Sequence, residues 1–170
     1  MNHWALIGVL AGSYLLGAVP MSHIVAMRSA RVDLRAVGSG TVSPWNLYRA
    51  AGFWPAILAG AFEVAKGVVG PVVCGPGRLW WAAAAGALAV VGHNWSPWLR
   101  GAGGRGLSPA TGALFVVAWP GAAVMCAGLL AGLLTRRVIR AMGVALCLVV
   151  PVLLLTGGPA SALADRKSVV

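Results

Sequence analysis

The chain has 170 residues, of which 59% are hydrophobic and only 9% are charged, a composition that excludes an ordinary soluble domain and is typical of a small polytopic membrane protein. Its 13 basic and 3 acidic residues give a net charge of +10. The basic residues stand in short gaps between apolar runs, so we expect basic membrane-surface loops and anionic ligands rather than a nucleic-acid partner. The three cysteines have no paired spacing and predict neither a metal site nor a disulfide.

The first predicted membrane span covers residues 4–27, which is long enough to cross the hydrocarbon core of a bilayer. Pro20 is expected to kink this span near its end. The positive-inside rule places that end in the cytoplasm and the N-terminus outside, because three arginines follow at once: Arg28, Arg31 and Arg35. The N-terminus has no basic region before its apolar run, so a cleaved signal peptide is not expected.

A polar turn, GSGTVSPWNLYR, occupies residues 38–49. A helix that starts near Pro44 would place Asn46 and Arg49, three residues apart, on one face. Together with the serine of the Gly-Ser-Gly turn, these side chains would offer a hydroxyl, an amide and a guanidinium to a single anion. An ordinary loop at the start of a helix explains the same pattern equally well.

The second predicted span covers residues 51–74 and carries Glu63 and Lys66. Ionisable side chains inside a membrane segment are costly and normally face a partner or a cavity. The spacing of three residues lets these two pair with each other, and we expect this structural pairing, with polar support of a nearby site as the alternative. A CGPG turn then leads into a third span over residues 79–98, which returns the chain to the cytoplasm.

The segment with the most chemical character is GHNWSPWLRGAGGRG, at residues 92–106. Its glycines allow backbone N–H groups to approach a ligand closely and to form a concave anion site. Arg100 and Arg105 add fixed positive charge with forked donors that suit phosphate or carboxylate. A flexible cytoplasmic turn whose arginines only obey the positive-inside rule is an equally good explanation of the loop alone.

The apolar stretch over residues 107–134 contains Trp-Pro-Gly near its middle. Two short helices hinged at Pro120-Gly121 would return the following arginines to the cytoplasm, whereas a single crossing would leave them outside. We therefore expect the hinge. A further span is predicted over residues 141–156, and the polar remainder of the chain is too short to cross.

These segments together resemble the bacterial PlsY family, the acyl-phosphate-dependent glycerol-3-phosphate acyltransferases. The opening SYLLGAVP is similar to the family's YLLGS-I-P helix, and Glu63-x-x-Lys66-Gly67 stands where the family has Asp-x-x-Lys-Gly. Residues 92–106 are similar to the family's GH-x-F-P-x-F…K-G-G-K-G motif. The first cytoplasmic motif is matched in length and keeps Gly38, Ser39, Gly40, Asn46 and Arg49. The resemblance runs from about Tyr14 to Arg140.

The sequence also departs from the family pattern. TVSPW replaces a second Asn, a Gly and an Ala-Thr pair, and the two motif lysines are Ala102 and Arg105 here. Leu-Ser-Pro replaces Val-Ala-Thr after the loop, and Ile139 stands at the serine of a T-R-Y-V-S segment. The family's basic C-terminal tail has no match in Asp165-Arg166-Lys167, from which we expect feeble or lost acylation.

The resemblance implies transfer of a fatty acyl group from acyl phosphate to glycerol 3-phosphate, giving lysophosphatidic acid and phosphate without a cofactor. It implies six substrate-binding residues, namely Ser39, Asn46, Arg49, Gly103, Gly104 and Arg105. It assigns structural support to Gly38, Gly40, Glu63 and Lys66. His93 is the candidate catalytic base, and hydrogen-bonded support of the site is its alternative role.

The expected fold is an all-α polytopic integral membrane bundle of about five to seven hydrophobic segments, including short hinged helices. We expect one transmembrane domain over residues 1–170, with cytoplasmic motif loops at about 28–50, 99–108 and 135–140. The bacterial inner membrane is the expected location, with membrane lipids as partners and the site on the cytoplasmic side. There are two alternatives to this function. The protein is a weak or inactive relative that keeps an anion or lipid site, or it is a small anion transporter.

Overall fold

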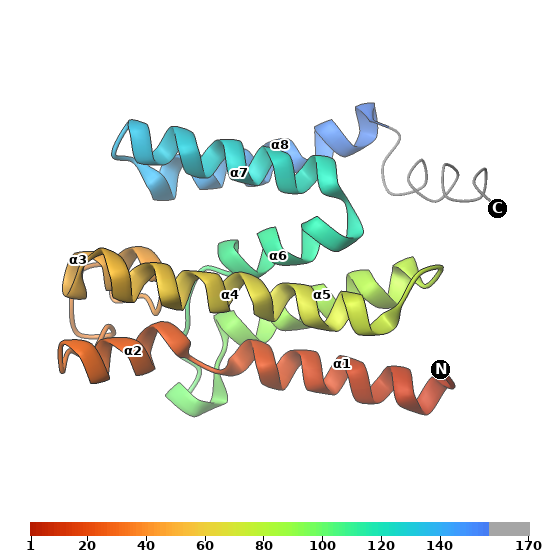
Figure 1. Cartoon of the computed structure of the whole chain (residues 1–170), viewed down its shortest axis with the longest axis horizontal. Coiled ribbons are helices and arrows are strands. Elements are labelled where there is room, and N and C mark those ends of the chain that lie inside the picture. The colour runs from red at the N-terminus through yellow and green to blue at the C-terminus, as the bar shows by residue number, and fades with distance from the viewer. Residues whose placement is uncertain (157–170) are drawn as a thin grey trace.

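The computed structural model describes residues 1–156, which form eight α-helices and one 3-10 turn and contain no β-strand (Figure 1). The expectation about Asp165-Arg166-Lys167 falls outside the described residues. The helices are α1 His3–Ala18, α2 Met21–Ser29, α3 Pro44–Ala51, α4 Phe53–Cys74, α5 Leu79–Asn94, η1 Pro97–Leu99, α6 Leu107–Val117, α7 Trp119–Leu134 and α8 Val138–Leu155.

Three helical stretches are long and apolar enough to cross a membrane, namely His3–Ser29, Phe53–Cys74 and Val138–Leu155. Helices α6 and α7 are apolar but shorter, with 11 and 16 residues. The prediction of an all-α integral membrane bundle that includes short helices is confirmed.

The helices lie in layers, with α1 and α2 along one side and the antiparallel pair α7–α8 along the other (Figure 1). Between them, α4 packs on α1, α5 and α6, and α6 is the element that joins this group to α7. The end of α2, helix α3 and the α7–α8 turn lie at one end of the bundle, whereas the α4–α5 turn lies at the other (Figure 1). Short α6 therefore holds the α7–α8 pair beside α4.

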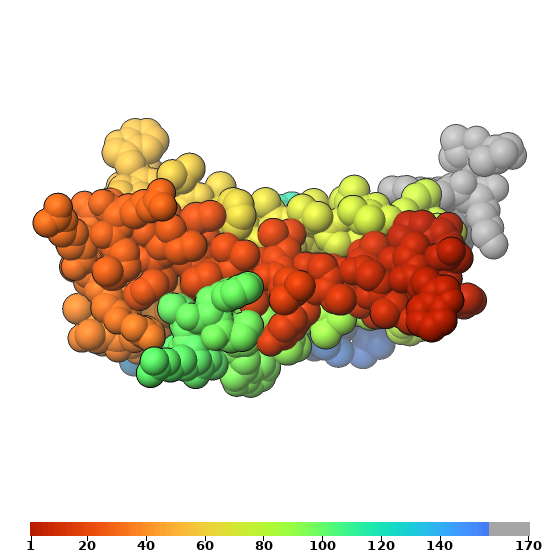
Figure 2. All heavy atoms as spheres, turned by 90° about the horizontal axis from the view of Figure 1, so that it is seen from below, coloured from red at the N-terminus to blue at the C-terminus, as the bar shows by residue number. Residues whose placement is uncertain are grey.

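The predicted kink at Pro20 is a complete break between α1 and α2. Side chains from α4 and from the segment after α5 hydrogen-bond to the backbone at this break. Proline cannot donate a backbone hydrogen bond, so the last carbonyls of α1 need other partners. Lys66 Nζ donates to the carbonyl oxygens of Gly17 and Val19, at 2.8 Å each. Ser96 Oγ donates to the Ala18 oxygen at 2.6 Å, and its segment lies over the α1–α2 junction (Figure 2).

Three predicted boundaries were wrong by a few residues. Helix α5 ends at Asn94 rather than Trp98, because Ser96 precedes a proline and takes an extended conformation. The hinge in the 107–134 stretch lies at Ala118, and Pro120 sits in the first turn of α7, where its missing N–H costs nothing. Helix α8 begins at Val138 rather than at residue 141.

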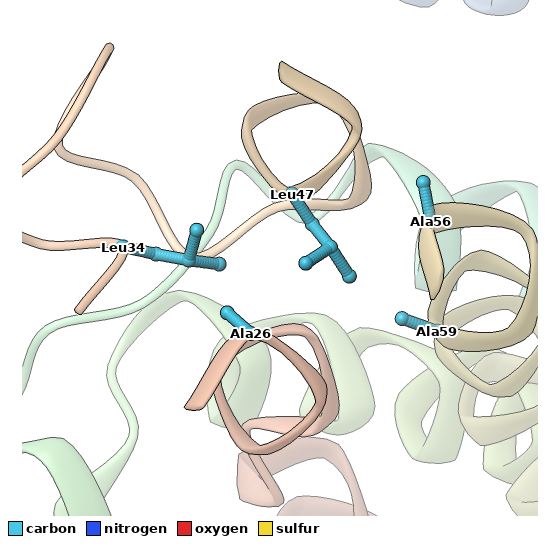
Figure 3. Close-up of a cluster of buried hydrophobic side chains, with 5 residues drawn as sticks. All are labelled: Ala26, Leu34, Leu47, Ala56 and Ala59. Atoms are coloured by element: carbon cyan, nitrogen blue, oxygen red, sulfur yellow. The ribbon is translucent and has the colours of Figure 1, made fainter. Parts of the chain in front are cut away.

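Helix α3 starts at Pro44, as predicted, and is anchored by one buried leucine. Ser43 caps its N-terminus by accepting a hydrogen bond from the Asn46 N–H at 3.3 Å. Leu47 is fully buried in a small cluster with side chains from α2, α4 and the preceding loop, drawn in Figure 3 as Ala26, Leu34, Ala56 and Ala59. This anchor fixes the helix that carries the exposed residue Arg49.

Candidate active site

A buried polar centre lies in the middle of α4. Glu63 and Lys66 are 0% and 1% exposed, and Lys66 Nζ lies 2.6 Å from Glu63 Oε2. His93 Nδ1, from the end of α5, lies 2.8 Å from the same carboxylate oxygen. Glu63 Oε1 accepts hydrogen bonds from the N–H and the hydroxyl of Ser22, at 3.3 and 3.2 Å. The predicted Glu63–Lys66 pair is present, and the structure adds the histidine.

His93 connects this centre to the glycine loop at residues 101–106. The Gly104 N–H donates to the His93 carbonyl oxygen at 3.1 Å. A Cβ atom at Gly104 would collide with His93 Nε2 and the Val42 carbonyl oxygen, so only glycine allows this close approach. The contact to Glu63 occupies Nδ1, so Nε2 is the ring nitrogen on the side of the glycine loop.

The two motif loops are joined to each other by a backbone hydrogen bond. The Val42 N–H donates to the Gly103 carbonyl oxygen at 3.0 Å. Ser39 Oγ lies 2.7 Å from Thr41 Oγ1, which lies 3.2 Å from Ser43 Oγ, so three hydroxyls form a chain along the first loop. Thr41 and Ser43 belong to the TVSPW segment that departs from the PlsY pattern.

Asn46 holds the first loop rather than facing open space. It is 1% exposed, and the two N–H donors of its Nδ2 are shared among three backbone carbonyl oxygens, those of Leu34, Val37 and Thr41, at 3.0–3.1 Å. Its Oδ1 accepts from the Ser39 N–H at 3.3 Å. Gly38 adopts a left-handed φ of 58° directly against this oxygen, a conformation that favours glycine.

A groove of about 890 Å³ runs between α3 and α4 on one side and α6, α7 and α8 on the other. Most of it is apolar, and Phe53, Ile57 and Val64 of α4 face Cys126, Leu129 and Leu133 of α7 across it. Its polar lining consists of Ser43, Tyr48, Arg49, His93, Arg105, Ser108, Thr111 and Arg136. The groove thus combines a group of cations with an apolar channel.

The groove cations have no acidic partners within residues 1–156. The chain has only two carboxylates there, Asp33 and Glu63, and both are already paired. Arg35 Nη2 lies 2.7 Å from Asp33 Oδ2, and this guanidinium holds the pKa of the Asp33 carboxyl well below its usual range. Arg49, Arg105 and Arg136 therefore give the groove an uncompensated positive charge that favours anionic ligands.

Of the residues predicted for the site, Arg49, His93 and Arg105 come together in this groove. The others support it from behind or stand beside it, namely Gly38, Ser39, Gly40, Asn46, Glu63, Lys66, Gly103 and Gly104. Sequence reasoning missed Ser43, Tyr48, Ser108 and Thr111, which carry no signal beyond being polar. It placed Arg136 in the segment that resembles T-R-Y-V-S but assigned it no role at the site. Within residues 1–156, no three His, Cys, Asp or Glu side chains gather as metal ligands.

Comparisons with known proteins agree on one family. The glycerol-3-phosphate acyltransferase family matches residues 7–167. The glycerol-3-phosphate acyltransferase of Halalkalibacterium halodurans is 39% identical over 115 residues, which cover 65% of this chain and 54% of the relative. That of Synechococcus sp. (strain JA-2-3B'a(2-13)) is 33% identical over 151 residues, which cover 88% of this chain and 75% of the relative.

A similar fold is known from a solved structure. The crystal structure of PlsY (YgiH), an integral membrane glycerol 3-phosphate acyltransferase in its glycerol 3-phosphate form, matches with a TM-score of 0.84 and 27% identity over 94% of this chain and 81% of that chain. The chain spans little more than half the length of some relatives, 54% and 59% in two cases. By family match, sequence identity and fold, the chain belongs to the glycerol-3-phosphate acyltransferase family.

Proposed function

We propose that this protein transfers a fatty acyl group from acyl phosphate to glycerol 3-phosphate, giving lysophosphatidic acid and inorganic phosphate. The observation that carries the proposal is the groove itself, in which unpaired cations adjoin an apolar channel. A substrate with a phosphate head and a fatty chain matches both parts of the groove. Its phosphate would pair with the arginines, and its chain would bury apolar surface along the channel.

The solved relatives support the choice of substrates. Two structures of PlsY, at 27% and 25% identity, are a glycerol 3-phosphate form and a lysophosphatidic acid form. Acyl phosphate as donor rests on the family resemblance of the two loop motifs. Membrane lipids surround the bundle, so a fatty chain reaches the groove from the side.

Each motif has a distinct role in this proposal. Arg49 and Arg105 bind phosphate oxygens through charged hydrogen bonds. Gly103 and Gly104 hold the loop that carries Arg105, because the Gly103 carbonyl oxygen accepts from the Val42 N–H and the Gly104 N–H donates to the His93 carbonyl oxygen. Ser39 lies on the first loop, and its hydroxyl is linked through Thr41 to Ser43, which lines the groove. Asn46 positions this loop. Phosphate is a good leaving group, so positioning and charge stabilisation supply most of the acceleration.

His93 is the proposed base, and the Glu63 carboxylate orients it. Its Nδ1 is held by Glu63 at 2.8 Å, and the side chain lines the groove while only 6% exposed. The ring would take the proton from the primary hydroxyl as the new ester bond forms. Replacing His93 with Gln, which keeps a polar side chain, should lower kcat by about 10²–10⁴-fold. A kcat close to wild type would leave His93 as a support of the glycine loop.

The direct test measures phosphate release from acyl phosphate by purified protein, with and without glycerol 3-phosphate. The proposed enzyme releases phosphate only with the acceptor present and forms lysophosphatidic acid in equal amount. Accumulation of labelled glycerol 3-phosphate in vesicles without conversion would instead identify an anion transporter. Neither activity would identify an inactive relative.

We further propose that the site faces the cytoplasm of a bacterial inner membrane. The support is that α3, the end of α2 and the α7–α8 turn, all basic, lie at one end of the bundle (Figure 1). Cysteine substitutions at Arg35, Arg100 and Arg137 should stay unlabelled by an impermeant thiol reagent added outside intact cells. The natural cysteines need prior replacement, and a cysteine at Arg78 in the α4–α5 turn should be labelled. Labelling at Arg137 alone would contradict this topology.

A further inference from the structure

The turn between α7 and α8 brings a third cation to the groove. Arg136 lines the groove together with Arg49 and Arg105, but it comes from the α7–α8 side, whereas Arg49 belongs to α3. Arg137 and Arg140 follow within four residues and do not line the groove. These three arginines therefore differ in placement although they carry the same charge.

Arg136 adopts a backbone conformation that normally favours glycine. Its φ of 56° is left-handed, and the Arg137 N–H donates to the Gly132 oxygen at 2.9 Å, which closes the end of α7. Glycine is the usual residue at such a helix end. Arg31 and Arg100 share this conformation outside the groove, so the conformation alone does not mark a site. Among these three arginines, Arg136 is the one that also lines the groove.

The chemistry of the groove needs more than one anion site. In the proposed reaction both substrates carry a phosphate, and two like-charged groups must be held close together. Arg136 lies two residues after the end of α7, whose Leu129 and Leu133 line the apolar part of the groove. A fatty chain packed along α7 would place its phosphate next to Arg136. Arg49 and Arg105 then remain for the acceptor.

We propose that Arg136 binds the phosphate of the acyl phosphate donor, whereas Arg49 and Arg105 bind that of glycerol 3-phosphate. The inference rests on the proposed function and refines it, because it divides the cations of one groove between two substrates. Arg136 is exposed and pairs with no carboxylate among residues 1–156, so the side chain is available for a ligand.

Steady-state kinetics test this division. Arg136→Ala should raise the KM for acyl phosphate by about 10- to 100-fold, the scale of a lost charged hydrogen bond, and leave the KM for glycerol 3-phosphate within about twofold. Arg137→Ala, which removes the same charge one residue away, should change neither constant. Arg136→Lys should recover part of the loss. A rise in the KM for glycerol 3-phosphate instead, or equal effects of Arg136→Ala and Arg137→Ala, would overturn the inference.

A binding measurement separates this inference from the proposed function. Dodecyl phosphate, a chain with a phosphate head that cannot donate an acyl group, is titrated into purified protein in detergent, and the change in tryptophan fluorescence is followed. Arg136→Ala should bind it at least tenfold more weakly than wild type and Arg137→Ala. Wild type that binds this probe but never releases phosphate from acyl phosphate would refute the proposed function and retain the Arg136 subsite. Absent or Arg136-independent binding would overturn the subsite itself.

Discussion

The protein handles charge in two opposite ways. In the polar centre, Glu63 and Lys66 are buried, and their polar atoms are satisfied by each other, by His93 and Ser22, and by backbone carbonyls of the broken α1–α2 segment. In the groove, three arginines are exposed and have no carboxylate partner among residues 1–156. Paired charges in an apolar bundle hold helices in place, and unpaired cations are left for ligands.

His93 and the glycine loop lie where the two regions meet. Glu63 contacts the imidazole ring of His93, and the His93 backbone carbonyl oxygen accepts a hydrogen bond from the Gly104 N–H. Gly104 in turn lies close to Val42 of the first loop. A change in the polar centre should therefore reach the groove through His93. The predictions below test whether the two regions differ as described.

The largest effect is expected in the polar centre. Glu63→Gln leaves the buried Lys66 without a counter-charge, and breaking a buried ion pair from one side costs about 3–5 kcal/mol of stability. The thermal unfolding midpoint of the protein in detergent should fall strongly. The double change Glu63→Gln with Lys66→Met should cost less than the sum of the two single changes, because it removes the stranded charge. Additive losses would mean that the pair is not coupled.

A smaller effect, confined to ligand binding, is expected in the groove. Arg49→Ala and Arg105→Ala should each weaken use of glycerol 3-phosphate by about 2–3 kcal/mol in kcat/KM, and the unfolding midpoint should hardly change. Arg78→Ala is the control, because its side chain bonds to the Cys74 carbonyl oxygen outside the groove. Equal losses at all three positions would mean that overall charge, rather than a site, is being measured.

The junction between the regions is sensitive to a single methyl group. Gly104→Ala places a Cβ against His93 Nε2 and the Val42 oxygen, and such overpacking costs about 1–3 kcal/mol. Activity should be lost together with stability. Gly12→Ala, on a face of α1 with open space, is the matched control and should be neutral or slightly stabilising. A fully active Gly104→Ala variant would show that the loop rearranges freely.

The smallest effect is expected at the surface pair of Asp33 and Arg35, which is exposed to solvent. The Arg35 guanidinium lowers the pKa of Asp33 in the folded state, so the pair stabilises the protein above the ordinary aspartate pKa of about 3.9. This contribution is lost as pH falls through the lowered pKa. Asp33→Asn should therefore unfold slightly earlier than wild type at neutral pH, and the difference should vanish in strong acid. An unchanged difference there would show that charge is not its cause.

Much of the molecule follows from its sequence. Apolar runs long enough to span a bilayer predicted the membrane helices, and Pro44 predicted the start of α3, because these signals act locally. Pro20 predicted a kink at the place where the structure has a complete break between α1 and α2. The spacing of Glu63 and Lys66 predicted their contact on one helix. The motif pattern predicted the family, and Arg49, His93 and Arg105 do meet in one groove.

Other features depend on contacts between residues far apart in the chain, which no local pattern encodes. The Glu63–His93 contact joins residues thirty positions apart, and Lys66 reaches the α1 end forty-seven positions away. Asn46, expected beside Arg49 at the anion, instead turns into the loop because three carbonyl oxygens need its amide. Arg136 shares a basic turn with Arg137, and only the packing of α7 and α8 against the rest of the bundle decides which of the two lines the groove.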